Sequence, residues 1–251
     1  MARFLLIHGS CHGAWCWRAT AEALARLGHA ARAIDLPAHG SDPTPAAVAT
    51  LQGYADAILA ATDDPCFHDG PAVLVAHSAG GYPATLAAAL APGRIGQVIY
   101  LCAYVPVPGR SMIDLRRAGP RQPLAGVVRA DSGGVTYSAD PAGARRTFYH
   151  DCPEGAVADA LPRLCPEPIA PQATPLPAGT ETPPQPRHYI LCKDDHTIPP
   201  EYQAEMARPF GPAVSRLPCG HSPFLTAPAR LARMLSDIAG TAPLPSAPGL
   251  R

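Results

Sequence analysis

The sequence predicts an α/β fold in which a mostly parallel, six-stranded sheet carries helices on both faces and a cap insertion. Short apolar runs alternate with segments of helical periodicity, first in residues 3–103 and again from residue 187 onward. Between these two parts the alternation stops and prolines become frequent. Alternating strands and helices form parallel sheets whose faces are covered by helices, and an interrupting segment is typical of an insertion.

Composition and length limit the classes of function. The chain has 251 residues, with 20 basic and 20 acidic side chains and a formal net charge of zero. A neutral balance favours neither nucleic acid nor an anionic membrane surface as a partner. The apolar run near the N-terminus is too short for a secretory signal, and no run has the length of a membrane span. We therefore expect a cytoplasmic protein of one α/β domain with an insertion, or of two small domains.

Cysteine and histidine spacing gives no metal site. The 8 cysteines are scattered without C-x-x-C pairs, so we expect reduced thiols in the core, with a Cys152–Cys165 disulfide as an alternative. His8 and His12 have a metal-ligand spacing only on a helix, and the glycines beside them indicate a loop. We predict no metal and no cofactor.

The first part of the chain contains four predicted strands and three predicted helices. The helix over 50–62 shows Leu51, Tyr54 and Ile58 at helical spacing, and Gly28 ends the helix before it. The expected strands cover 3–8, 29–36, 72–77 and 94–103, and the expected helices cover 19–27, 50–62 and 79–91.

Residues 106–186 are predicted to form a cap or lid over the strand ends. This segment holds fifteen prolines and lacks strand–helix alternation. Short helices are expected over 111–117, 142–149 and 153–163, followed by an irregular segment over 166–186. The predicted core is therefore formed by residues 1–105 and 187–251.

Alternation resumes after the insertion. Strands are predicted over 187–193 and 213–217, and helices over 200–208 and 224–238. The tail over 241–251 is rich in Pro, Gly and Ala, and we expect it to be frayed.

The most informative stretch is Ala-His-Ser-Ala-Gly-Gly at residues 76–81. It joins an apolar strand to an alanine-rich helix, which is the setting of a nucleophile elbow centred on Ser78. Small neighbours let strand and helix approach, although Ala76 stands where the usual motif has Gly. The alternative is a serine that caps the helix.

An acid and a histidine follow in the order that a serine nucleophile requires in this type of fold. His221 comes just after the last predicted strand, behind a glycine, and can act as the base. Asp194 and Asp195 both follow the strand over 187–193, and the spacing fits either as the acid that orients the base. His77 and Asp35 are interpreted as structural.

Two backbone N–H groups are expected to stabilise an oxyanion. Ala79 begins the elbow helix, and Ser10 lies in the loop after the first strand, where Gly9 allows a close approach. Four residues near or in the insertion are expected to wall an apolar substrate pocket together with Gly9, with core packing of the insertion as the alternative: Tyr104, Met112, Phe148 and Tyr149.

Four motifs together resemble the α/β-hydrolase superfamily. They are the stretches 4–17, 76–81, 198–203 and 220–225. More narrowly, the chain resembles the branch of plant hydroxynitrile lyases and methylesterases and its bacterial carboxylesterase relatives. The resemblance implies an α/β-hydrolase fold, Asp195 as the acid, and Ser10 and Ala79 as the oxyanion donors. Relatives of this type often form dimers, so a homodimer is possible.

Two departures from the lyases favour ester hydrolysis. In the lyases of this branch a Thr follows the first-strand histidine and a Lys follows the catalytic histidine, whereas this chain has Gly9 and Ser222. The resemblance therefore implies a serine hydrolase acting on small to medium hydrophobic carboxylic esters. The alternatives are a hydroxynitrile lyase and a catalytically weak protein that binds a small ligand.

Overall fold

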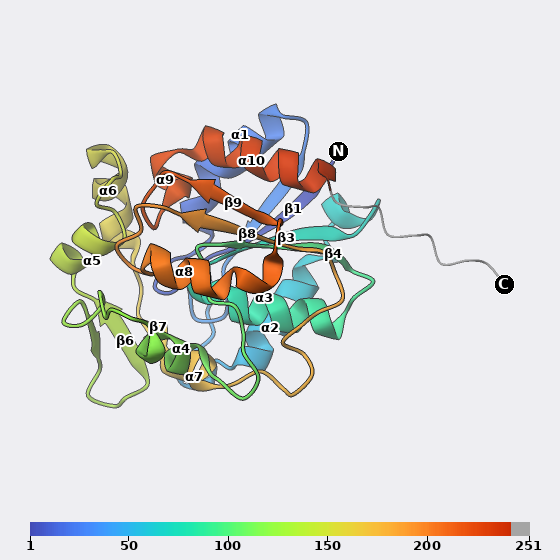
Figure 1. The fold of residues 1–251 in the computed structure, drawn as a ribbon. Helices are drawn as coiled ribbons and strands as arrows, with labels where there is room; N and C mark the ends of the chain where they lie inside the picture. The colour runs from blue at the N-terminus through green and yellow to red at the C-terminus, as the bar shows by residue number, and fades with distance from the viewer. Residues whose placement is uncertain (242–251) are drawn as a thin grey trace.

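The computed structural model describes residues 1–241, so the predicted tail from 242 onward lies outside the described residues. Its centre is a sheet of six parallel strands in the order β2-β1-β3-β4-β8-β9 (Figure 1). The strands are β1 (Arg3–Ile7), β2 (Ala30–Ile34), β3 (Ala72–His77), β4 (Ile95–Leu101), β8 (Arg187–Cys192) and β9 (Val214–Leu217). The predicted fold class is confirmed.

Helices cover both faces of this sheet. Alternate residues of β1 face opposite ways: Leu5 belongs to the same apolar cluster as α2 and α3, and Leu6 to the cluster of α1 and α10. One face carries α1 (Arg18–Arg26) and α10 (Pro228–Thr241), and the other carries α2 (Leu51–Ala61), α3 (Gly81–Leu90) and α8 (Pro200–Met206) (Figure 1). Burial on both faces explains why the strands are continuous apolar runs.

Local signals set several helix ends as predicted. Thr50 caps α2, because its side chain accepts a hydrogen bond from the backbone N–H of Gly53. Helix α1 ends just before Gly28, which has a φ of 81°. Short 3-10 helices are η1 (Ala14–Trp17), η2 (Ala46–Val48), η3 (Pro65–Phe67), η4 (Ser78–Gly80), η5 (Leu161–Arg163) and η6 (Arg208–Phe210).

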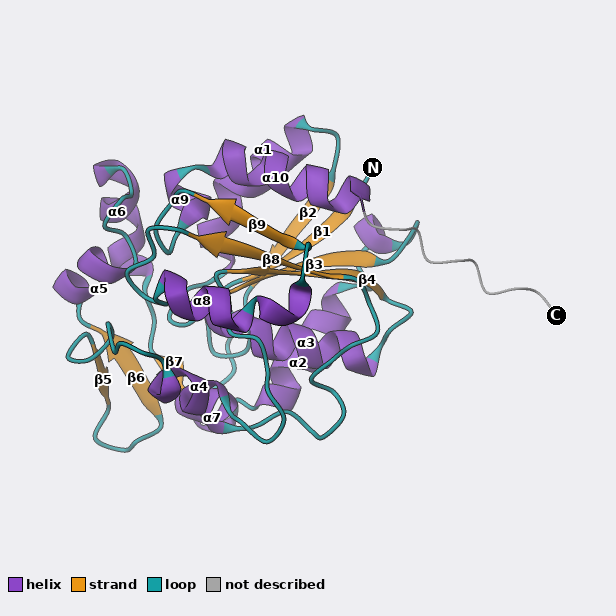
Figure 2. Ribbon diagram, in the orientation of Figure 1, coloured by secondary structure: helices purple, strands orange, loops and turns teal. Residues whose placement is uncertain are grey.

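The segment 106–186 is more regular than its prolines suggest. Besides α4 (Met112–Ala118), α5 (Pro141–Thr147) and α6 (Glu154–Ala160), it contains a small antiparallel sheet, which Figure 2 shows apart from the central sheet. Its strands are β5 (Val128–Ala130), β6 (Thr136–Ala139) and β7 (Glu167–Pro168), and α7 (Ile169–Ala173) follows directly.

The prediction of an irregular segment over 166–186 is therefore wrong at its start. Strand β7 has two residues and is held by pairing with Thr136 and Tyr137, which are far away in the sequence. Pro168 then serves as the N-cap of α7, a position where proline is tolerated because no intrahelical donor is lost. Strands this short have no periodicity that a sequence can reveal.

The single helix predicted over 224–238 is also wrong in one respect. It consists of α9 (Pro223–Thr226) and α10, separated at Ala227. Proline disfavours the helical conformation in the residue before it, and Pro228 follows Ala227 directly.

The eight cysteines all lie in the described residues and all carry free thiols, so the alternative Cys152–Cys165 disulfide is not formed. The Cys152 sulfur instead contacts the hydroxyl of Thr226 at 3.2 Å, and the Cys165 sulfur faces the Cys11 carbonyl at 3.6 Å. Among residues 1–241, none of the helices combines the length and apolar character needed to cross a bilayer.

Candidate active site

The order of the central strands reverses between β1 and β3. The chain moves from β1 outward to β2 on one side, and from β3 outward to β4 on the other. Ligands in open α/β sheets bind outside the carboxyl ends of the strands at such a point. Ser10 follows β1 and Ser78 follows β3 directly, so the topology brings these two loops together at one edge.

Ser78 has the backbone conformation of a nucleophile elbow. Its φ is +54°, which costs a residue other than glycine about 1–3 kcal/mol and is maintained by its surroundings. The Ser78 carbonyl accepts a hydrogen bond from the Tyr104 N–H at 3.1 Å. Close backbone approach explains the two glycines that follow: a Cβ on Gly80 would lie 2.6 Å from the His8 carbonyl oxygen, and one on Gly81 2.2 Å from that of Tyr104.

Three side chains from different loops form one hydrogen-bonded chain. The Ser78 Oγ lies 3.1 Å from the His221 Nε2, and the His221 Nδ1 lies 2.8 Å from the Asp195 Oδ2. Their exposed fractions are 7%, 2% and 3%, respectively. Because the carboxylate can only accept, the Nδ1 carries the proton and the Nε2 is free to accept from the serine hydroxyl. Asp194, the other candidate, is exposed and does not take part.

Both oxygens of the buried Asp195 carboxylate accept hydrogen bonds. Its Oδ1 accepts from the backbone N–H groups of Thr197 and Ile198 at 2.6 and 2.9 Å, and its Oδ2 accepts from the Gln203 amide at 2.8 Å. Donors compensate for the loss of water around a buried charge. The carboxylate is thus fixed in the position from which it orients His221.

Gly9 lies against the elbow. A Cβ at this position would be 2.7 Å from the Ser78 Cβ and 2.9 Å from the His77 Nδ1, so no larger residue fits. Within residues 1–241, no loop carbonyl or side chain accepts a hydrogen bond from the backbone N–H of Ser10 or Ala79. Both N–H groups are therefore available as donors in the loops that follow β1 and β3.

Comparison with known proteins agrees with this geometry. The profile of the Alpha/beta hydrolase family matches residues 4–234. The chain belongs to the α/β-hydrolase family. Methylesterase 4 of Arabidopsis thaliana is 30% identical over 257 residues, covering 94% of this chain and 96% of its own length. Methylesterase 18 of the same plant is 28% identical, covering 95% and 97%.

Solved structures give the same result. The crystal structure of a pyrethroid hydrolase from Sphingobium faniae superposes with a TM-score of 0.83 at 25% identity, covering 96% of this chain and 98% of that one. The resemblance to the methylesterase branch is thus confirmed, and this α/β-hydrolase is a carboxylesterase-type enzyme.

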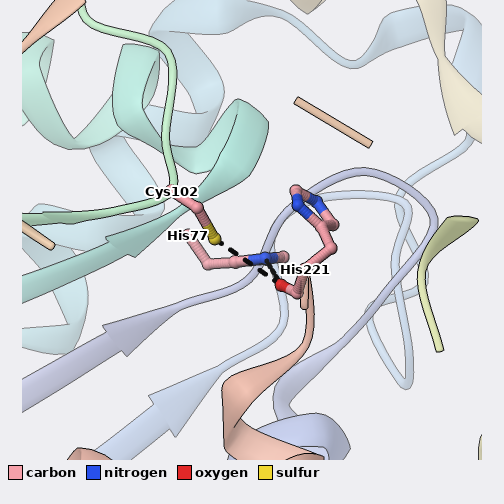
Figure 3. A group of neighbouring side chains, drawn as sticks. All are labelled: His77, Cys102 and His221. Atoms are coloured by element: carbon pink, nitrogen blue, oxygen red, sulfur yellow. Dashed lines mark hydrogen bonds between the residues drawn. The ribbon is translucent and has the colours of Figure 1, made fainter. Parts of the chain in front are cut away.

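His77 and Cys102 both contact the backbone carbonyl group of His221. The His77 Nε2–H donates to the His221 carbonyl oxygen at 2.9 Å, and the Cys102 thiol lies 3.6 Å from the same oxygen (Figure 3). Burial lowers the pKa of His77 well below its usual value, so its ring is neutral. Candidate ligand atoms of these three residues lie within 4.8 Å of one another. Since both ring nitrogens of His221 face Ser78 and Asp195, we interpret the cluster as a support for this histidine.

Two adjoining cavities, both lined by Ser10 and Met112, flank the nucleophile. The Ser78 cavity is lined by Ser78 and His221 and by mainly apolar and aromatic neighbours that include Tyr104, Leu124, Val128, Tyr137 and Phe148. The Glu167 cavity is lined by Gly9, Ala79, His39, Tyr54 and Glu167 among others.

The structure brings four of the five predicted pocket residues to these cavities. Tyr104, Met112 and Phe148 line the Ser78 cavity, and Gly9 lines the Glu167 cavity. Tyr149 lines neither: it is buried in the apolar cluster of α5 and α6, and its hydroxyl lies 2.8 Å from the His12 Nε2. Tyr149 therefore lies where the alternative of core packing places it.

Sequence reasoning missed a buried ion pair next to the glycine loop. Glu167 of β7 accepts the Cys11 backbone N–H and faces the His39 Nε2, both at 2.8 Å through the same oxygen. The His39 Nδ1 lies 3.1 Å from the Pro37 carbonyl. Both ring nitrogens therefore face acceptors, so His39 is an imidazolium.

The charge on His39 agrees with its surroundings. Burial alone would lower the pKa of His39, but the Glu167 charge and hydrogen bond outweigh burial and raise it. The histidine could have been noticed in the loop after the second strand. Glu167 could not, because it lies in a two-residue strand among prolines.

Proposed function

We propose that this α/β-hydrolase cleaves small to medium hydrophobic carboxylic esters with Ser78 as the nucleophile. The observation that carries the proposal is the chain of contacts from the Ser78 Oγ through His221 to Asp195, at 3.1 and 2.8 Å. A serine hydroxyl is a weak nucleophile at neutral pH and needs an adjacent base that a third group orients.

The first half-reaction forms an acyl-enzyme. The Ser78 Oγ attacks the ester carbonyl carbon while its proton passes to the His221 Nε2. Asp195 keeps the Nδ1 proton in place and stabilises the imidazolium that forms. The tetrahedral intermediate then collapses, His221 returns the proton to the leaving alkoxide, and the alcohol departs.

The second half-reaction releases the acid. Water gives a proton to His221 as it attacks the acyl-enzyme, and Ser78 recovers its proton when the acid leaves. In both halves the developing oxyanion would accept hydrogen bonds from the backbone N–H groups of Ser10 and Ala79, which have no other acceptor among the loops and side chains of residues 1–241.

The surroundings of the site support esters with an apolar body. Half of the residues that line the cavity with Ser78 are apolar side chains or tyrosine and phenylalanine, and most of these come from the segment 106–186, which we take as a cap over the strand ends. The similar proteins are named methylesterases and a pyrethroid hydrolase, which also points to carboxylic esters. Eight free thiols support a reducing compartment such as the cytoplasm.

The lyase alternative lacks a cation where the resemblance requires one. Ser222, which directly follows His221, is buried and its hydroxyl has no partner in the described chain. It provides no ammonium group to stabilise a cyanide leaving group.

A kinetic panel tests the proposal. Wild type should hydrolyse 4-nitrophenyl esters of graded acyl length, and Ser78→Ala and His221→Ala should each lower kcat on the order of 10⁴-fold. Asp195→Asn should lower kcat strongly, whereas the matched Asp194→Asn should keep it. Equal activity of wild type and Ser78→Ala would overturn the assignment. Cyanide release from mandelonitrile that requires Ser78 would favour the lyase.

A further inference from the structure

Arg116 is a cation in the Ser78 cavity. It lies on α4, is half-buried, and lines this cavity together with Ser78 and His221. Within residues 1–241 its guanidinium makes no hydrogen bond and no ion pair. Five other arginines each pair with a carboxylate: Arg3, Arg32, Arg94, Arg121 and Arg145.

The acid of α4 and one acid of α8, Asp114 and Glu201, are already engaged. The Asp114 carboxylate, two residues before Arg116 on α4, accepts from the backbone N–H and the hydroxyl of Ser111. Glu201 forms a two-bond pair with Arg121. The Ser78 cavity itself has no Asp or Glu among its lining residues in the described chain. Arg116 therefore lacks a counter-charge of its own.

A second donor without a partner lines the same cavity. In the described chain the Tyr104 hydroxyl makes no hydrogen bond, although the residue is almost fully buried. Burial raises the pKa of Tyr104, with the charge of Arg116 as the next largest influence and in the opposite direction, so the phenol keeps its proton. The hydroxyl can therefore donate a hydrogen bond to a ligand in this cavity.

A carboxylate satisfies both groups. A guanidinium presents a planar pair of donors that matches the two oxygens of a carboxylate, and a phenol can add a third hydrogen bond. The apolar side chains of Met112, Val128 and Phe148 line the same cavity and would contact the body of the ligand.

We propose that the substrate is an ester that carries a carboxylate group, which Arg116 and Tyr104 bind while Ser78 attacks the ester carbonyl. This proposal rests on the proposed function of the site. Its substrate class comprises half-esters of dicarboxylic acids, with the anion in the acyl part, and esters of hydroxy acids, with the anion in the alcohol part. In both kinds of ester the carboxylate would bind to Arg116 in the same way. The assay distinguishes whether the acyl part or the alcohol part carries the carboxylate.

The test compares matched anionic and neutral esters. In the acyl arm, mono-4-nitrophenyl glutarate is paired with 4-nitrophenyl pentanoate. In the alcohol arm, 4-carboxyphenyl butanoate is paired with 4-acetylphenyl butanoate. For each arm the readout is the ratio of kcat/KM for the anionic ester to kcat/KM for the neutral one.

In at least one arm the ratio should fall about tenfold or more in Arg116→Gln, since a charge-assisted hydrogen bond is worth at least that much. Tyr104→Phe should lower the same ratio to a smaller extent. The matched control is Arg117→Gln, because Arg117 lies on the same helix, is exposed and does not line the cavity. Its ratio should stay within about twofold of wild type.

The outcomes separate this proposal from the proposed function. If wild type hydrolyses the neutral esters but all variants share one ratio in both arms, carboxylate binding is overturned while the esterase assignment stands. If no ester is hydrolysed, the proposed function fails, and calorimetry with monomethyl glutarate decides the binding site. If monomethyl glutarate binds to wild type but not to Arg116→Gln, carboxylate binding by Arg116 is supported. If it binds equally to the two proteins, or to neither, carboxylate binding by Arg116 is overturned.

Discussion

Gly9 shows how strongly one residue constrains the site. Its missing side chain lets the loop after β1 approach the elbow, since a Cβ would be 2.7 Å from that of Ser78. Both Cβ atoms are bonded directly to the backbone, so the contact can be relieved only by a shift of the main chain. The position of the Ser10 N–H depends on this approach.

Gly9→Ala should lower kcat about 10²-fold, the usual effect of losing one oxyanion donor, while circular dichroism shows a retained fold. The proposed physical reason is displacement of the Ser10 N–H from the developing oxyanion. Gly155→Ala, on α6 with open space around it, is the matched control and should keep wild-type activity. Full activity of Gly9→Ala would show that the loop is not held as tightly as described.

Strand β7 has only two residues, but its Glu167 contacts two loops that are distant in the sequence. Through Glu167 it ties the segment 106–186 to two loops of the core, at Cys11 and His39. Cys11 has a φ of +61°, so its strained conformation is maintained partly by this hydrogen bond. The ion pair therefore stabilises the loop that carries Ser10.

The ion pair should make stability depend on pH. The pKa of His39 is raised in the folded state, so the pair contributes fully below the unfolded value near 6.5 and its contribution is lost as the pH rises through the folded pKa. Burial, followed by the charge of Glu167, raises the pKa of Cys11, Tyr54 and Tyr137, so their acidic groups stay protonated over this range.

Urea unfolding of wild type and Glu167→Gln tests this pair. At pH 6 the variant should lose about 3 kcal/mol in the free energy of unfolding, because it leaves one partner of a buried pair alone. The difference should shrink between pH 6 and pH 9. A difference that is constant or grows with pH would contradict the assignment of the charge to His39. Glu154→Gln, which removes an exposed ion pair with Arg145, should change stability little at either pH.

Elements with local signals were predictable from the sequence, and elements fixed by distant partners were not. Strand β3 and the elbow follow from one contiguous motif, and α2 follows from its spacing and its Thr50 cap. Strand β7 is fixed by pairing with a distant strand and is too short to show a periodicity of its own. The break at Ala227 depends on a single proline, and the helical periodicity continues on both sides of it.

The same distinction applies to the site. Ser78 was predictable because it directly follows an apolar strand, and His221 because it lies in the loop after the last strand; parallel strands end at one edge of the sheet. The acid was open between Asp194 and Asp195 on spacing, and the loop geometry now brings Asp195 to His221. Glu167 was not predictable because it lies in a two-residue strand among prolines. The helix of Arg116 was predicted, but its position at the Ser78 cavity depends on how α4 packs in the fold.

At the scale of the whole molecule, the central parallel sheet brings loops that are distant in the sequence to the same edge. Residues 143 positions apart in the sequence, Ser78 and His221, meet because β3 and β9 belong to one parallel sheet. The segment 106–186 then adds Arg116, Phe148 and Glu167 to the edge where these loops converge. The loops after the central strands thus carry Ser78 and His221, and the segment 106–186 contributes several residues of the cavity wall.

The central claim is that this convergence makes Ser78 a nucleophile, and covalent labelling tests it most directly. Folded wild type treated with a fluorophosphonate should gain one adduct, which peptide mass spectrometry locates at Ser78. Ser78→Ala should gain none, and His221→Ala should react far more slowly because the base is missing. An adduct on another residue of the wild type, or equally fast labelling of His221→Ala, would contradict the account.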